Sequence, residues 1–152
     1  MSKSFDELLD NLRHHWVAQG VQPSSGATDV EIRAFEVRRG CKLAQEVRSY
    51  FKQVNGVVGG RDGKRDRELL AFWNLNQVEP AADEAGTVAS GPLLVFADWS
   101  LSAHDYAFRA DAGGPGSEVF LIGGRKPEKV ASSLGEFLRG YMAGNRGVLF
   151  GA

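Results

Sequence analysis

Apolar residues in the first half of the chain recur every three to four positions, which is the spacing of amphipathic helices. This spacing predicts helices over about residues 4–19, 29–39 and 44–54. The second half instead contains short, continuous apolar runs, which are typical of strands buried on both faces. These runs are Leu69–Trp73, Leu93–Ala97 and Val119–Ile122.

Local signals mark the ends of the second and third helices. Thr28 and Glu31 form the capping-box pattern that satisfies unpaired N–H groups at a helix start. Gly40 follows the second apolar stripe, where a C-terminal cap needs a positive φ. Asn55 and Gly56 follow the third, and they are residues that readily turn left-handed. We therefore expect both helices to end at these positions.

The remaining segments complete an α+β pattern. His104–Arg109 alternates between two faces, which predicts a further strand. Ser133 begins a last helix that ends near Gly144. Helices followed by strands and one closing helix predict a single α+β domain over residues 1–152, with a largely antiparallel sheet and helices packed on one side.

Bulk composition narrows the class of protein. The 152 residues are 43% hydrophobic and 24% charged, with a formal net charge of -1, so no global charge attracts nucleic acid or an anionic membrane. The single cysteine, Cys41, has no partner for an internal disulfide and is expected to be a small packing residue. No apolar run approaches the roughly 20 residues that span a bilayer. We expect a cytoplasmic protein with no membrane or nucleic-acid partner.

Motifs for phosphate, metal and cofactor binding are incomplete. Gly63-Lys64 lacks the first glycine and the final hydroxyl of a phosphate-binding loop. His14 and His15 are adjacent on a helix, so their side chains diverge by about 100° and cannot share one metal. We therefore expect no metal site and no cofactor.

A polar cluster between two predicted strands is the best catalytic candidate. Its members are Asp98, Trp99, Ser100, Ser102, His104 and Asp105. A small hydrolase could assemble a Ser–His–Asp set there. However, His104 and Asp105 are neighbours on a strand and point to opposite faces, so this carboxylate cannot orient that imidazole. We expect no catalytic residue, with the hydrolase as the alternative.

Charge patterning suggests where a partner binds. Gly59–Arg67 mixes glycines with charges of both signs, which predicts an exposed turn. Glu79, Asp83 and Glu84 concentrate negative charge in a segment that Pro80 keeps out of a regular strand.

Trp99 is a second candidate contact, since an aromatic residue on a polar connection can anchor an interface. The alternative for Trp99 is a residue that covers the core.

The first half also resembles the SUKH superfamily. The family pattern is an apolar residue, Phe-Glu, a Gly, a Leu-Pro step, a helix with an aromatic residue, and Asn-Gly. Here these positions are Ile32, Phe35-Glu36, Gly40, Leu43-Ala44, Tyr50-Phe51 and Asn55-Gly56. Ala44 replaces the usual proline, which is a mild departure because alanine is a good helix former. With the later strands and the closing helix, the resemblance covers about residues 29–143.

This resemblance implies a function in protein binding. The superfamily includes bacterial immunity proteins encoded beside polymorphic toxins, many of them nucleases, and fungal regulators of cell-wall synthesis. It therefore implies an immunity protein that occludes a toxin domain, to which an acidic segment would be complementary. A signalling adaptor is the other alternative that the resemblance leaves open.

Overall fold

The computed structural model describes residues 3–81, 87–88, 91–101, 103–109, 118–123 and 127–151. Its helices and 3₁₀ turns are α1 (Lys3–Ala18), α2 (Asp29–Arg39), α3 (Gln45–Gln53), η1 (Gly60–Asp62), η2 (Leu75–Gln77), α4 (Leu134–Ala143) and α5 (Arg146–Phe150). Its strands are β1 (Leu70–Phe72), β2 (Glu79–Pro80), β3 (Thr87–Val88), β4 (Gly91–Trp99), β5 (His104–Arg109), β6 (Val119–Ile122) and β7 (Glu128–Ala131).

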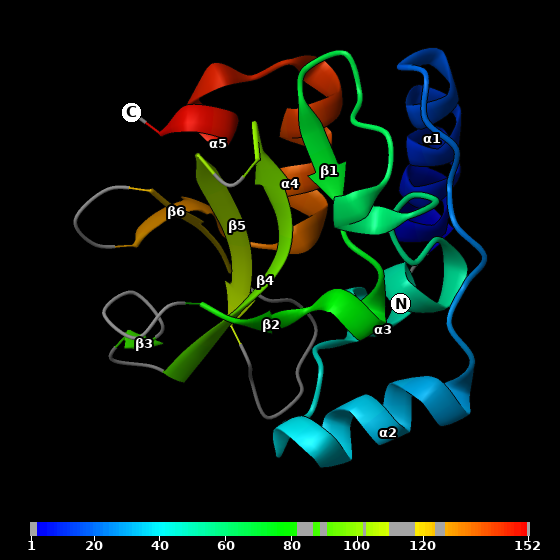
Figure 1. Ribbon diagram of the computed structural model, residues 1–152, viewed down its shortest axis with the longest axis vertical. Coiled ribbons are helices and arrows are strands. Elements are labelled where there is room, and N and C mark those ends of the chain that lie inside the picture. The colour runs from blue at the N-terminus through cyan, green and yellow to red at the C-terminus, as the bar shows by residue number, and fades with distance from the viewer. Residues whose placement is uncertain are drawn as a thin grey trace.

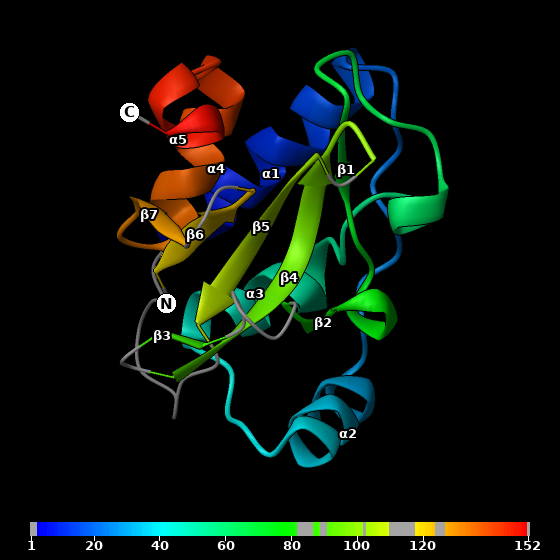
Figure 2. The same cartoon turned by 60° about the vertical axis from the view of Figure 1, so that its left-hand side comes forward.

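One antiparallel sheet organises the fold (Figures 1 and 2). Its strand order is β1-β4-β5-β6-β7, and the short strands β2 and β3 also pair with β4. The continuous apolar runs at β4 and β6 thus lie in strands with neighbours on both sides. The α+β prediction with a largely antiparallel sheet is confirmed.

The main hydrophobic core lies between one face of this sheet and helices α1, α3 and α4. The ring of Phe137 on α4 contacts Phe96 on β4 and Tyr106 on β5, with centroids 5.7 and 5.2 Å apart. Trp16 on α1 and Tyr50 on α3 are fully buried. The helical stripes therefore face the sheet from one side, as predicted.

A second, smaller apolar cluster occupies the other face of the sheet. Trp73, Leu93, Val95, Ala107 and Phe120 form it, and each is at most 7% exposed. Side chains from Leu93 to Phe96 on β4 alternate between this cluster and the main core, and at a register shift Ala97 joins the main core beside Phe96. Burial on both faces explains why the strand shows a continuous apolar run rather than alternation.

The predicted helix ends are confirmed. Thr28 Oγ1 accepts a hydrogen bond from the Glu31 N–H at 3.1 Å, and Glu31 Oε1 accepts one from the Thr28 N–H at 2.8 Å. Gly40 ends α2 with a φ of 63°, and Asn55 and Gly56 follow α3 with φ values of 52° and 70°. Contacts between residues close in the sequence are therefore sufficient to set the ends of these helices.

Several short elements, β7 among them, were not predicted from the sequence. Glu79 and Pro80 form β2, opposite Val95 and Leu94, although Pro80 was expected to keep this segment out of a strand. The strand is only two residues long, and proline is tolerated at a sheet edge. Helix α5 was not predicted either, because five residues are too few to show helical periodicity.

Candidate functional site

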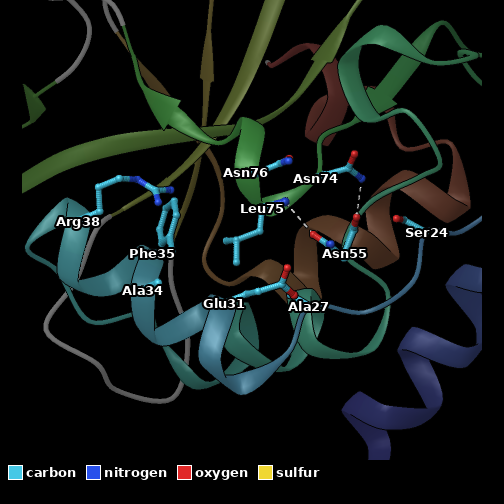
Figure 3. Close-up of a pocket in the computed structure, with 10 residues that line it drawn as sticks. All are labelled: Ser24, Ala27, Glu31, Ala34, Phe35, Arg38, Asn55, Asn74, Leu75 and Asn76. Carbon is cyan, nitrogen blue, oxygen red and sulfur yellow. Dashed lines mark hydrogen bonds between the residues drawn. The ribbon is translucent and has the colours of Figure 1, made fainter.

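A groove lies between α2 and the segment that begins η2 (Figure 3). It encloses a cavity of about 310 Å³. Ala27, Phe35 and Leu75 line it with buried apolar surface. Leu75 points from η2 toward α2, with Arg38 at one end of the groove and Ser24 at the other.

Two asparagines build one wall of this groove. Asn55 Oδ1 accepts a hydrogen bond from the Leu75 N–H at 2.7 Å. Asn74 Nδ2 donates to the carbonyl oxygens of Asn55 and Val57 at 2.8 and 2.9 Å. These bonds join the end of α3 to η2 across about twenty residues of sequence. The Asn-Gly pair thus ends a helix and also fixes the groove wall.

The rim of the groove is polar. The Arg38 guanidinium lies over the Phe35 ring, 5.5 Å from its centroid. Glu31 lines the groove while one of its carboxylate oxygens accepts the capping hydrogen bond of α2. An apolar floor with a few fixed polar groups suits non-covalent binding of a protein segment or a small ligand.

Of the acidic partner-binding candidates, only Glu79 lies within the described residues, since Asp83 and Glu84 lie outside them. Glu79 lies on β2, two positions after the end of η2, opposite Val95 of β4. It is about half exposed, and its Oε1 lies 3.5 Å from Arg61 Nη1. Glu79 does not line the groove.

Trp99 lies elsewhere, at the far end of β4. It is half-buried, stacks on His104 with centroids 5.4 Å apart, and meets the Phe150 ring edge-on at 5.2 Å. It also packs against the main core. Its contacts resemble those of a residue that covers the core, and the structure does not bring it together with Glu79, which pairs beside Val95.

The polar cluster around Asp98 has a different organisation from a Ser–His–Asp site. Asp98 is 1% exposed; its Oδ1 accepts a hydrogen bond from Trp73 Nε1 at 2.7 Å, and its Oδ2 accepts one from Arg65 Nη2 at 2.9 Å. Asp105 lies opposite Asp98 in the β4–β5 register, whereas His104 lies opposite Trp99. His104 and Asp105 therefore point to opposite faces, as predicted, and Ser102 lies outside the described residues.

The charged stretch Gly59–Arg67 is less exposed than expected. Arg65 joins the buried Asp98 pair, and Asp66 is 4% exposed. Asp66 accepts hydrogen bonds from the hydroxyl of Tyr141 and from the Leu70 N–H. Burial and the nearby Asp66 carboxylate hold the pKa of Tyr141 far above its usual range. Sequence reasoning missed these contacts because their partners are distant along the chain.

The surroundings of Cys41 predict that its thiol reacts slowly. Burial raises the pKa of its thiol, Glu36 raises it further, and Arg39 opposes this with a smaller effect. Since the thiolate is the reactive species, iodoacetamide should alkylate the native protein several-fold more slowly than free cysteine at neutral pH. Mass spectrometry of a time course measures the rate, and the urea-unfolded protein serves as the control. A native rate equal to that of free cysteine would contradict this assignment.

Within the described ranges, no three His, Cys, Asp or Glu side chains gather closely enough to hold a metal ion. None of the helices formed by these residues is both long and apolar enough to cross a bilayer.

Most of the chain matches the model of a known protein family. The model of the SMI1/KNR4 family (SUKH-1) matches residues 26–140, about three quarters of the chain. This range includes α2, α3, the groove and the sheet, and it confirms the resemblance seen in the sequence. No curated protein matches the chain.

Proposed function

The chain belongs to the SMI1/KNR4 family (SUKH-1), and from this premise we propose that it is a non-catalytic immunity protein. It neutralises a cognate polymorphic toxin domain in the cytoplasm by binding it stoichiometrically. The family match is the observation that carries the proposal, since the superfamily includes bacterial immunity proteins.

The geometry of the polar residues supports binding rather than catalysis. The Asp98 carboxylate is buried and engaged by Trp73 and Arg65, so its role is to hold the outer face of the sheet together. His104 lies on the other face, stacked on Trp99. By contrast, the groove between α2 and η2 is open to a partner, and the hydrogen bonds of Asn55 and Asn74 hold one of its walls in place. A rigid scaffold with an open groove is what an occluding protein needs.

We propose that the toxin contact is the acidic segment that begins at Glu79. Glu79, Asp83 and Glu84 would face a basic surface, such as the substrate-binding face of a nuclease. Opposite charges at the rim of an interface mainly accelerate association and select the partner. Trp99 is proposed as a secondary contact through its exposed part.

The function is tested with the toxin domain encoded by the neighbouring gene. Co-expression should restore growth of cells that produce the toxin, and light scattering should show a 1:1 complex of the purified proteins. Denaturing the complex should release chemically intact, active toxin. Continued toxicity without a complex, or recovery of a cleaved or modified toxin, would refute stoichiometric neutralisation.

The acidic contact is tested by removing its charge. The triple variant Glu79→Gln, Asp83→Asn and Glu84→Gln should associate with the toxin several-fold more slowly. The association rate of the variant should also depend less on salt concentration. Salt screens the attraction between the acidic segment and the toxin over a Debye length of about 8 Å at physiological ionic strength, and the variant lacks the charges that produce this attraction. Stopped-flow kinetics at several salt concentrations measure both effects, and the melting temperature should stay unchanged.

A matched control keeps the same change in net charge. Glu7→Gln, Asp10→Asn and Glu68→Gln remove three exposed carboxylates elsewhere on the surface. This control should retain most of the wild-type association rate. Equal slowing in both variants would show that net charge matters and the acidic segment does not.

A further inference from the structure

Helix α2 is apolar on two opposite sides. Ile32 and Phe35 face the core and are at most 1% exposed. Val30 and Val37 lie on the other side and are 78% and 77% exposed, with the exposed Ala34 between them. A surface helix ordinarily has one apolar stripe, so the outer stripe Val30–Ala34–Val37 requires an explanation.

The outer stripe has the geometry of a helix–helix seam. Its members are spaced by four and then three residues, as at the core positions of a coiled coil. Beside the stripe, Asp29, Val30, Arg33 and Ala34 border a surface hollow of about 410 Å³. Both ribbon views place α2 at the outer edge of the molecule (Figures 1 and 2). A second helix can therefore reach this side of α2.

The charged residues beside the stripe make this surface complementary to the same surface of a second copy. Glu31 and Arg38 lie on the same flank of α2, seven positions apart, as Val30 and Val37 do within the stripe. In an antiparallel pair of α2 helices centred on Ala34, each residue meets the one at the same distance on the other side of the centre. Val30 lies four residues before the centre and Val37 three after it, so Val30 and Val37 of the second copy are offset by only one residue, about 1.5 Å along the helix axis, and can contact each other. Glu31 and Arg38 of the second copy are offset by the same amount, which the long arginine side chain spans. Ala34 is small enough to allow close approach at the centre.

From this pattern we propose that α2 is a self-association surface, through which two copies of the chain pair antiparallel about a twofold axis. A partner of one charge sign would leave either Glu31 or Arg38 against a like charge, whereas a second copy satisfies both. A twofold interface requires this self-complementarity. The pairing stands independently of the proposed immunity function.

The dimer should be weak. Two helices of 11 residues bury much less than the roughly 1,600 Å² of a standard interface. The two copies of Arg33, on the other flank, also approach each other near the centre. Glu31, Ala34 and Arg38 line the groove as well, so the dimer covers one of its sides. A ligand in the groove should therefore favour the monomer.

Analytical ultracentrifugation of the full chain, from micromolar to millimolar concentration, tests the pairing. The wild-type protein should shift from monomer to dimer across this range. The double variant Val30→Glu and Val37→Glu should raise the dissociation constant at least about tenfold. Both positions are exposed, so circular dichroism should show an unchanged fold. Val58→Glu, at another exposed apolar site, is the matched control and should dimerise normally.

A charge cycle tests the antiparallel register. Arg38→Glu should weaken the dimer several-fold, because it places Glu31 against a second carboxylate. Glu31→Gln retains a capping-box side chain, so it changes the charge without removing the helix cap. Glu31→Gln should weaken the wild-type dimer but strengthen the Arg38→Glu dimer. A wild-type monomer at every concentration, a dimer insensitive to the Val30 and Val37 changes, or an effect of Glu31→Gln with the same sign in both backgrounds would each overturn the proposal.

Discussion

Gly56→Ala is expected to destabilise the protein by about 3–5 kcal/mol, which is exceptional for the addition of one methyl group. Gly56 has a φ of 70°, and a Cβ there would lie 2.4 Å from the carbonyl oxygen of Trp73 and 2.6 Å from that of Phe72. Both contacts are with backbone, so neither can be relieved by a change of rotamer. The backbone would have to move where Val57 donates a hydrogen bond to the Phe72 carbonyl at 3.1 Å.

Gly40→Ala separates the clash from the cost of the backbone conformation. Gly40 has a similar φ of 63°, but a Cβ there would meet nothing within 4 Å. We expect Gly40→Ala to cost only about 1–2 kcal/mol, the penalty of a left-handed L-residue. Urea denaturation of both variants measures the difference. Equal costs would show that Gly56 is required for its φ alone and not for the close approach of the chain.

Asp98→Ala is expected to destabilise the protein by about 3–5 kcal/mol, because it leaves a largely buried cation without its partner. Asp98 is 1% exposed, and its two oxygens accept hydrogen bonds from Trp73 Nε1 and Arg65 Nη2. The side chain of Arg65 is only 16% exposed, so water can replace the lost carboxylate only in part. Asp98→Asn should cost less, since its carbonyl oxygen can still accept the Trp73 hydrogen bond.

An exposed ion pair provides the control for Asp98. Glu79 and Arg61 approach to 3.5 Å with side chains 51% and 41% exposed, so Glu79→Gln should change stability by less than about 1 kcal/mol. Thermal and urea unfolding of the three variants compare the two pairs. If Asp98→Ala is as stable as Glu79→Gln, the buried pair does not stabilise the fold. Asp98 would then again be a candidate functional residue.

The proposed binding surfaces share part of one helix. Residues of α2 line the groove, and one of them, Ala34, also belongs to the outer stripe. If both proposals hold, toxin binding and self-association compete, and the complex should contain one copy of each protein. The two sets of variants distinguish the proposals, because Glu79 lies on β2 and takes no part in the α2 pairing.

The sequence by itself determined the parts of this protein that depend on near neighbours. The Thr28–Glu31 cap and the left-handed Asn55-Gly56 step involve contacts within a few residues, so local pattern was enough to predict them. Burial of β4 on both faces followed from an unbroken apolar run, since an exposed face would carry polar residues. The motif between Ile32 and Gly56 indicated the family, and the order of the elements was enough to predict the α+β architecture.

Tertiary structure alone decided which polar residues are buried together and which parts of the surface are hollow or apolar. Asp98 meets Arg65 and Trp73 across 33 and 25 positions, and Asp66 meets Tyr141 across 75 positions. No periodic pattern encodes such pairs, because the topology of the sheet and not the spacing of residues brings them into contact. The groove and the outer stripe of α2 also depend on how the elements pack against one another. Val30 and Phe35 are both apolar in the sequence, and only the packing of α2 turns Phe35 toward the core and leaves Val30 exposed to solvent.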